Sequence, residues 1–181
     1  MGADNKLLLP IDGEPVVRRV ARRLLDAELE DIVAVLGHEA DLVSSALDGL
    51  AIRAVINPDY RDGQMTSVHA GLAALSAPVD GIMICLADQP FLEARDYLAL
   101  VEAFAREGEK SIVVPTHDGR RGNPIVLSAA HREEILARGA NLGCKQFIAR
   151  NGNTTTLFRV TPGDVRTLSR KYWVERVDLV D

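Results

Sequence analysis

The stretch Gly81-Ile82-Met83-Ile84-Cys85-Leu86-Ala87-Asp88-Gln89-Pro90 carries the clearest information about the fold of this chain. Its first half is a short apolar run, which predicts a buried strand. Asp88 places a carboxylate at the carboxyl end of that strand, where open α/β sheets bind ligands. Pro90 has no backbone N–H, so we expect the chain to leave the sheet there. Asp88 therefore either holds a divalent cation against phosphates or caps a helix that starts near Glu93.

Short aliphatic runs alternate with helical segments along the sequence. The predicted strands are Ile32–Leu36, Ile52–Ile56, Ile82–Leu86, Ile112–Val114, a strand through Ile125 and Leu127, Thr154–Val160 and Val174–Val180. The predicted helices are Glu14–Glu28, Ala40–Leu47, Ser67–Leu75, Ala94–Arg106, His131–Ala137 and Gly143–Arg150. This pattern is typical of a sheet covered on both faces. It predicts one three-layer α/β/α, Rossmann-like domain with a mostly parallel sheet over residues 1–181.

Composition and charge argue against several classes of protein. The 181 residues are 47% hydrophobic and only 4% aromatic, which favours a single core of aliphatic side chains. The formal net charge of -5 and the scattered basic residues argue against a nucleic-acid partner. No long apolar span is visible, so no membrane partner is expected. Two cysteines, Cys85 and Cys144, do not make a disulfide framework, which favours a cytoplasmic location.

Two loop segments contain polar residues suited to binding phosphate. Lys6 lies within Gly2–Pro10, before the first predicted helix, and is either a point charge for a phosphate or a solvated surface side chain. The segment Gly63–Leu72 runs from a loop into a helix, with Thr66 or Ser67 as the expected N-cap. This helix start either presents free backbone amides to an anion or is an ordinary capped helix without a ligand.

A third polar segment, Arg120-Arg121-Gly122-Asn123-Pro124, follows the hairpin-type turn Asp118-Gly119. Its two arginines either receive an anionic substrate or form an exposed hairpin tip. The sequence has no Walker phosphate loop, no dinucleotide glycine fingerprint, no paired cysteines and no Gly-x-Ser-x-Gly elbow. The standard forms of those sites are therefore excluded.

Together these segments resemble the molybdenum cofactor cytidylyltransferases, within the wider family of molybdopterin-type nucleotidyltransferases. Four segments match in order: Met1-Gly2 through Asn5-Lys6-Leu7-Leu8 and Gly13, Gly63 through Ser67 and Gly71, Leu86 through Pro90, and Arg121 through Pro124. The resemblance covers nearly the whole chain. It implies a fold of the nucleotide-diphospho-sugar-transferase type. It also implies an enzyme in which a phosphate of the pterin cofactor attacks the α-phosphate of a nucleoside triphosphate and pyrophosphate leaves.

The resemblance also assigns roles to individual residues. It implies that Asp88 is a ligand of Mg²⁺ and that Lys6 stabilises phosphate charge, which makes both catalytic. The implied nucleotide-binding residues are Gly2, Lys6, Ser67 and Gly71, and the implied acceptor-binding residues are Arg121, Gly122, Asn123 and Lys145. CTP is favoured over GTP because Asn5–Leu9 resembles the cytidylyl branch. The other implied partners are a molybdopterin-type cofactor and a molybdoenzyme that receives it.

The chain departs from the family pattern in three places. No strand and Leu-Ala-Ala-Gly loop precede Met1-Gly2, so we expect an amino-terminal truncation and weakened nucleotide binding. Where members often have Gly-Asp-x-Gly-x-Arg, Ala140–Lys145 keeps a glycine and a cation but lacks the acid. Members usually end in Asp-x-Asp-Thr-Pro-Glu-Asp, and Asp181 stands at the first of those acids, which is consistent with a second truncation. Two alternatives follow: another small nucleotidyltransferase with a different phosphorylated acceptor, or a non-catalytic module that binds or delivers the cofactor.

Overall fold

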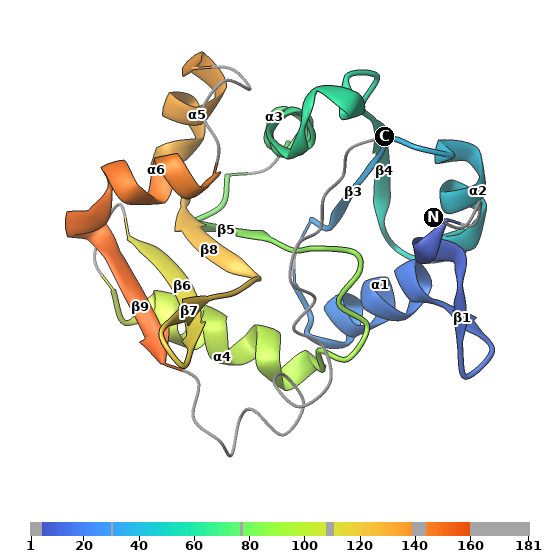
Figure 1. Ribbon diagram of the computed structural model, residues 1–181, viewed down its shortest axis with the longest axis horizontal. Helices are drawn as coiled ribbons and strands as arrows, with labels where there is room; N and C mark the ends of the chain where they lie inside the picture. Colours follow the sequence, from blue (N-terminus) through green and yellow to red (C-terminus); the bar gives the residue numbers. More distant parts are fainter. Residues whose placement is uncertain (1–4, 30, 77, 108–110, 139–143, 160–181) are drawn as a thin grey trace.

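The structure is a computed structural model that describes residues 5–29, 31–76, 78–107, 111–138 and 144–159 (Figure 1). The strands form its middle layer. One face is covered by α1 (Val16–Asp26) and α4 (Ala94–Ala105), and the other by α3 (Gln64–Ala74), α5 (Arg132–Arg138) and α6 (Cys144–Arg150) (Figure 1). Within these layers α1 contacts α4, and α3 contacts α5. The predicted three-layer α/β/α architecture is confirmed.

The strands of the middle layer form two sheets. In the smaller one, β3 (Val33–Leu36) and β4 (Arg53–Ile56) pair in parallel, and α2 (Ala40–Ala46) connects them. The larger, five-stranded sheet has the order β5-β8-β6-β7, with β9 paired to β6. Its strands are β5 (Gly81–Ile84), β6 (Ile112–His117), β7 (Arg120–Arg121), β8 (Ile125–Ser128) and β9 (Thr155–Arg159). In that sheet β6 and β9 are parallel, whereas β8 is antiparallel to both β5 and β6.

The Asp118-Gly119 turn joins β6 to β7, which pair in an antiparallel hairpin within the larger sheet. Thr116 pairs with Arg121, and His117 pairs with Arg120, so the turn residues form a two-residue hairpin loop. Their φ angles are 48° and 74°, and a two-residue turn that matches the twist of antiparallel strands needs positive φ at both positions. The hairpin predicted from this dipeptide is confirmed.

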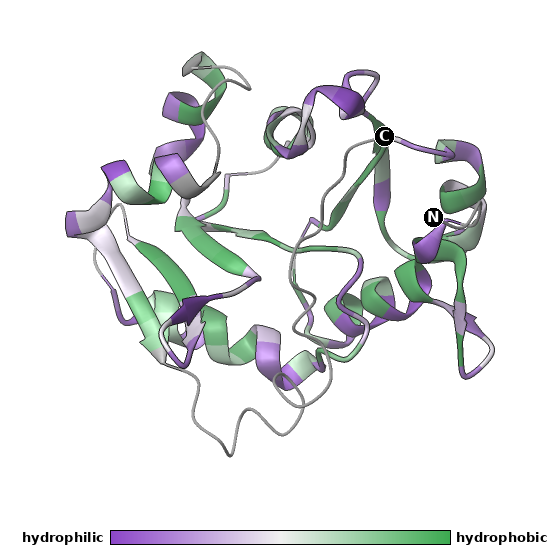
Figure 2. Ribbon diagram, viewed as in Figure 1, coloured by the Kyte–Doolittle hydropathy of each residue, from purple (hydrophilic) through white to green (hydrophobic). Residues whose placement is uncertain are grey.

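Hydrophobic residues are concentrated in β3, β5, β6 and β8 of the middle layer (Figure 2). The largest cluster joins α3, the five-stranded sheet, α5 and α6 through Met65, Val68, Leu72, Ile82, Ile112, Val114, Ile125, Leu127, Ile135, Phe147 and Ile148. A second cluster is centred on Leu36, at the end of β3, and on Val43 of α2. Leu7, Leu8 and Ala87 pack against this second cluster. Burial of these three residues against one cluster therefore brings the segment that contains Leu7 and Leu8 close to the segment that follows β5.

The remaining described elements are short. They are η1 (Lys6–Leu8), β1 (Pro10–Ile11), β2 (Glu14–Pro15), η2 (Tyr60–Asp62), η3 (Ala129–His131) and η5 (Gly152–Thr154). β1 and β2 pair with each other in an antiparallel hairpin. No helix in the described ranges combines the length and apolar character needed to cross a lipid bilayer.

Most element boundaries match the prediction, but the start of α3 does not. The helix begins at Gln64, and its N-cap is Gly63, so the predicted N-cap at Thr66 or Ser67 is wrong. Gly63 has a φ of 111°, a conformation that glycine adopts without steric cost. The chain therefore turns into the helix before it reaches the two hydroxyl residues. The strand predicted over Val174–Val180 lies outside the described residues.

Candidate functional site

Lys6 and Asp88 meet beside the second apolar cluster, where η1 contacts α1 and α2. Asn5 caps η1, since its Oδ1 accepts a hydrogen bond from the Leu7 N–H at 3.1 Å. In this short turn Leu7 is partly buried against the second apolar cluster, whereas Lys6 is exposed. Lys6 Nζ then lies 2.9 Å from Asp88 Oδ2, with the two side chains 49% and 23% exposed. Both groups remain accessible to a ligand from solvent.

Asp88 does not cap the following helix. The N-cap of α4 is Glu93, and Asp96 completes this helix start by accepting the Glu93 N–H at 2.8 Å. The helix-cap interpretation of Asp88 is therefore wrong. Asp88 follows β5 as predicted, although that strand ends at Ile84 rather than Leu86. Its only described ionic partner is Lys6.

The chemistry of the site limits how a metal ion can bind there. Within the described ranges, no three His, Cys, Asp or Glu side chains are grouped so as to hold a metal. Asp88 therefore offers a single carboxylate. Mg²⁺ commonly takes one or two carboxylates and completes its shell with water and substrate phosphates. The residues present thus fit a cation that binds together with a polyphosphate, and they do not form a metal cage of their own.

Ser67 is held by a residue that the sequence analysis missed. Asn57 directly follows β4 and is only 2% exposed. Its Nδ2 donates hydrogen bonds to Thr66 Oγ1 and Ser67 Oγ, both at 2.9 Å. The sequence does contain a signal for Asn57, because it directly follows the predicted strand Ile52–Ile56, just as Asp88 follows a predicted strand.

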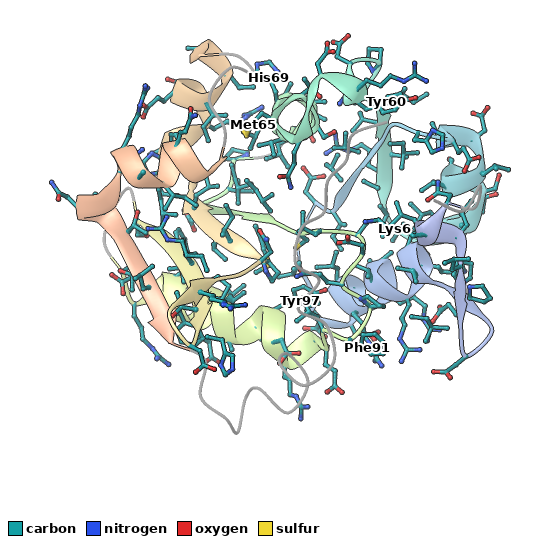
Figure 3. The ribbon with its side chains drawn as sticks, viewed as in Figure 1. Lys6, Tyr60, Met65, His69, Phe91 and Tyr97 are labelled. Atoms are coloured by element: carbon teal, nitrogen blue, oxygen red, sulfur yellow. The ribbon has the colours of Figure 1, made fainter. Side chains whose placement is uncertain are left out.

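A tyrosine ring packs on the residue that follows β3. A Cβ added at Gly37 would lie 2.6 Å from Tyr60 Cβ, so the chain needs glycine there for the two segments to approach. The Arg61 guanidinium lies 5.5 Å from the centre of the Tyr60 ring, and the His38 ring lies 6.3 Å from it. Figure 3 shows Tyr60 beside the start of α3. This packing fixes the loop that leads from β4 to Gly63 and Ser67.

Gly71 and His69 have structural contacts on α3. A Cβ at Gly71 would lie 3.1 Å from a methyl group of Val35, so the glycine lets α3 pack closely on β3. His69 Nε2 lies 3.1 Å from the Leu136 carbonyl oxygen, a contact that joins α3 to α5 (Figure 3). These contacts explain both residue types without a ligand, and a nucleotide-binding role for Gly71 stays a prediction.

Three of the predicted acceptor residues, Arg121, Gly122 and Asn123, lie in β7 or just after it. Arg121 is exposed in β7, and the Gly122 N–H donates to the Pro115 carbonyl at 2.8 Å. Asn123 precedes Pro124, the residue before β8. Figure 1 places this hairpin in the larger sheet, away from the dark-blue segment that precedes α1. Lys145 lies in α6, but its side chain and the whole of Gly2 lie outside the described part of the structure.

Comparison with known proteins identifies the family. Residues 1–155 match the MobA-like NTP transferase domain. The chain belongs to this family. The resemblance to the molybdopterin-type nucleotidyltransferases is thereby confirmed, and the chain is a nucleotidyltransferase of the MobA-like family.

Individual relatives of this MobA-like domain have diverse names. Nicotine blue oxidoreductase from Paenarthrobacter nicotinovorans is 27% identical over 95% of this chain and 88% of that protein. The bifunctional protein GlmU from Sorangium cellulosum is 31% identical over 89% of this chain, which spans only 34% of GlmU.

Solved structures agree on the fold. A nucleotidyl transferase from Methanothermobacter thermautotroptrophicus has a TM-score of 0.72 and 22% identity, covering 90% of this chain and 78% of that one. Molybdopterin-guanine dinucleotide biosynthesis protein A from Archaeoglobus fulgidus has a TM-score of 0.64 and 13% identity over 92% of this chain and 80% of that one. The Rossmann-like nucleotidyltransferase fold is therefore confirmed.

Proposed function

We propose that this domain transfers CMP from CTP to the phosphate of a molybdopterin-type cofactor, releasing pyrophosphate in a Mg²⁺-dependent reaction. The observation that carries the proposal is the pairing of Lys6 with Asp88 within a MobA-like domain. A cation and a carboxylate in contact provide one group for phosphate and one for a metal ion. CTP is preferred to GTP because the Asn5–Leu9 segment resembles the cytidylyl branch of the family.

The bond changes define what the side chains have to do. An oxygen of the acceptor phosphate forms a bond to the α-phosphorus of CTP. The bond between that phosphorus and the oxygen bridging to the β-phosphate breaks, and pyrophosphate leaves with the electron pair. Mg²⁺, when bound, screens the phosphate charge that this step concentrates.

The residues of the chain bind and orient the two substrates in this proposal. Lys6 is a point charge against the triphosphate, and Asp88 holds the cation. Gly2, Ser67 and Gly71 contribute to the nucleotide site. The acceptor phosphate is assigned to Arg121, Gly122, Asn123 and Lys145. Residues 1–181 act as one domain, which we place in the cytoplasm, where a molybdoenzyme receives the finished cofactor.

Two solved relatives support the choice of substrates. CMP:2-keto-3-deoxy-manno-octonic acid synthetase, described in complex with CTP, has a TM-score of 0.63 and 14% identity. Rv0371c from Mycobacterium tuberculosis, described in complex with manganese, has a TM-score of 0.71 and 20% identity. Those ligands belong to those proteins. They show only that related folds accept a cytidine nucleotide or a divalent cation.

The test is a product assay with the purified protein. Molybdopterin cofactor, Mg²⁺ and either CTP or GTP are incubated with the protein, and mass spectrometry follows the pterin dinucleotide while an enzymatic assay follows pyrophosphate. The proposal requires a cytidine dinucleotide that depends on the protein and disappears with Asp88→Asn. A guanine dinucleotide would correct the nucleotide. Pyrophosphate release with another phosphorylated acceptor would correct the acceptor, and pterin binding without turnover would indicate a delivery module.

The oxidoreductase among the relatives supplies a second candidate. It aligns with 95% of this chain and covers 88% of its own length, so the alignment is not confined to a shared segment. The second candidate function is an oxidation or reduction of a compound related to nicotine blue. Incubation with nicotine blue and NADH or NADPH tests it. Oxidation of the nicotinamide that requires the protein, without pyrophosphate release from CTP, would favour this candidate over nucleotidyl transfer.

A further inference from the structure

Asn57 occupies a buried position that the sheet fixes. Its backbone N–H donates to the carbonyl of Leu36, the last residue of β3, at 2.7 Å, which continues the parallel pairing one residue beyond β4. With 2% of its surface exposed, the side chain cannot reach a ligand in solvent. Any effect of Asn57 on a ligand must therefore pass through the residues that its amide contacts.

The orientation of the Asn57 amide follows from its neighbours. Oδ1 accepts the Asp59 backbone N–H at 3.0 Å, so the oxygen side of the amide is fixed by a donor that cannot change. Nδ2 faces the hydroxyl oxygens of Thr66 and Ser67. A flipped amide would direct NH₂ at the Asp59 N–H, which would bring two donors together. Asn57 therefore uses both protons of Nδ2 on the two hydroxyls.

This donation decides where the hydroxyl protons go. A hydroxyl has one proton, and an oxygen that accepts from Asn57 must direct its own proton elsewhere. Thr66 Oγ1 lies 2.8 Å from the Gly63 carbonyl oxygen and 2.9 Å from that of Asp59, so its proton has acceptors within the protein. Within the described part of the chain, Ser67 Oγ has no hydrogen bond other than that from Asn57. The Ser67 proton is thus left for an acceptor from outside.

We propose that Asn57 is a positioning residue that makes the Ser67 hydroxyl a hydrogen-bond donor to an acceptor oxygen of the bound nucleotide. This inference rests on the proposed function and concerns the same site. The acceptor is an oxygen without a proton, either on a phosphate or on the pyrimidine ring. Ser67 does not donate its proton to Asn57, because the atom of Asn57 that faces Ser67 is Nδ2, which is a donor and not an acceptor.

Asn57→Asp inverts the polarity at almost constant shape. The carboxylate keeps the acceptor for the Asp59 N–H, and its second oxygen accepts from the hydroxyls in place of donating to them. The Ser67 proton then turns toward the protein interior and is lost to the ligand. Because a carboxylate at a position with 2% exposure costs desolvation energy, the free energy of unfolding of Asn57→Asp is measured alongside its CTP affinity.

The first measurement needs no ligand. In ¹H–¹⁵N NMR spectra, we expect the two side-chain amide protons of Asn57 to exchange slowly with solvent. Ser67→Ala releases one of them and Thr66→Val the other. Fast exchange of both protons in the wild-type protein would overturn the assigned polarity.

The second measurement is calorimetric titration with CTP in the presence of Mg²⁺. Loss of one hydrogen bond to a ligand weakens binding by about tenfold, so we expect about that loss for Asn57→Asp and for Ser67→Ala. The double variant Asn57→Asp/Ser67→Ala should bind no more weakly than Ser67→Ala alone, because the same proton is lost once. Thr66→Val is the matched control, since it removes a partner of the same amide and should leave CTP affinity within about twofold.

The outcomes separate this inference from the proposed function. Unchanged CTP affinity in Asn57→Asp would overturn the proposed role of Asn57 in orienting the Ser67 proton. A loss in Asn57→Asp that adds fully to the loss in Ser67→Ala would also overturn it, because such a loss indicates repulsion between the new carboxylate and the ligand. Inorganic tripolyphosphate and cytidine are titrated separately into the wild-type protein and Ser67→Ala. The probe whose affinity falls in the variant carries the acceptor, which is a phosphate oxygen for tripolyphosphate and a base oxygen for cytidine. Absence of CTP binding in the wild-type protein would instead overturn the proposed function, and with it any ligand role for Ser67.

Discussion

Lys6 Nζ contacts Asp88 Oδ2 at 2.9 Å, although 82 positions separate the two residues in the sequence. The pair is a partly exposed ion pair, and such pairs stabilise proteins by at most about 1 kcal/mol. Its significance lies in binding, because each member is the other's counter-ion until ligands arrive. A triphosphate would take Lys6, and a metal ion would take Asp88.

The first prediction concerns the carboxylate. Asp88→Asn keeps the size of the side chain but removes the charge that attracts a hard cation. We expect kcat/KM for pyrophosphate release to fall by at least about a hundredfold, which corresponds to roughly 2.7 kcal/mol. The free energy of unfolding without ligand should change by less than about 1 kcal/mol. Turnover against Mg²⁺ concentration is the measurement, and normal metal dependence in the variant would contradict the assignment.

The second prediction concerns the cation of the same pair. Lys6→Met releases Asp88 from its counter-ion, so the carboxylate should bind Mn²⁺ more tightly when no nucleotide is present. CTP affinity should fall at the same time, by about tenfold, because the phosphate loses a point charge. Electron paramagnetic resonance of free Mn²⁺ measures the first effect and calorimetry the second. Weaker Mn²⁺ binding in Lys6→Met would mean that the two side chains do not compete with the ligands in this way.

The third prediction concerns the close approach of Gly37 and Tyr60. Gly37→Ala places a methyl group 2.6 Å from Tyr60 Cβ, so the tyrosine segment must shift. We expect a loss of about 1 to 3 kcal/mol in the free energy of unfolding, as for other overpacked sites. Gly152→Ala is the matched control, since a Cβ there meets nothing within 4 Å. Urea denaturation of both variants is the test, and equal stabilities would show that the Tyr60 segment adjusts freely.

The fourth prediction concerns stability at alkaline pH. Burial raises the pKa of the Cys85 thiol from its ordinary 9.0 to about 12. Between these values the unfolded chain loses the proton while the folded chain keeps it, so stability is fully present below pH 9 and decreases as the pH rises toward 12. The contribution of one such group is a slope of at most about 1.4 kcal/mol per pH unit.

Cys85→Ala should flatten this decrease, and denaturant titrations from pH 8 to pH 11 measure it. Burial also raises the pKa of Tyr97, which contacts the same cluster as Cys85, so a residual alkaline slope remains in the variant. An unchanged slope in Cys85→Ala would contradict the burial of the thiol. A Cys144→Ser background keeps the second cysteine out of the comparison.

The sequence by itself determined the order and type of most elements. Each predicted strand and helix depends on a local pattern of apolar residues, and burial of that pattern requires only that some partner surface exists. The Asp118-Gly119 hairpin was equally local, because positive φ at two successive residues is a property of those residues. The polar residues at strand exits, above all Asp88, were visible for the same reason.

Only the tertiary structure decided which of these polar residues meet. The contact between Lys6 and Asp88 depends on Leu7 and Ala87 packing on one apolar cluster, and no local pattern encodes a contact between such distant segments. The start of α3 was set by Gly63, whose φ of 111° ended the loop before the hydroxyl residues that would otherwise cap the helix. The sequence does not reveal the role of Asn57, because that role depends on its burial and on its contacts with the hydroxyls of Thr66 and Ser67 in the first turn of α3. Hydrogen-bond polarity of this kind depends on neighbours in space, which the order of residues along the chain does not contain.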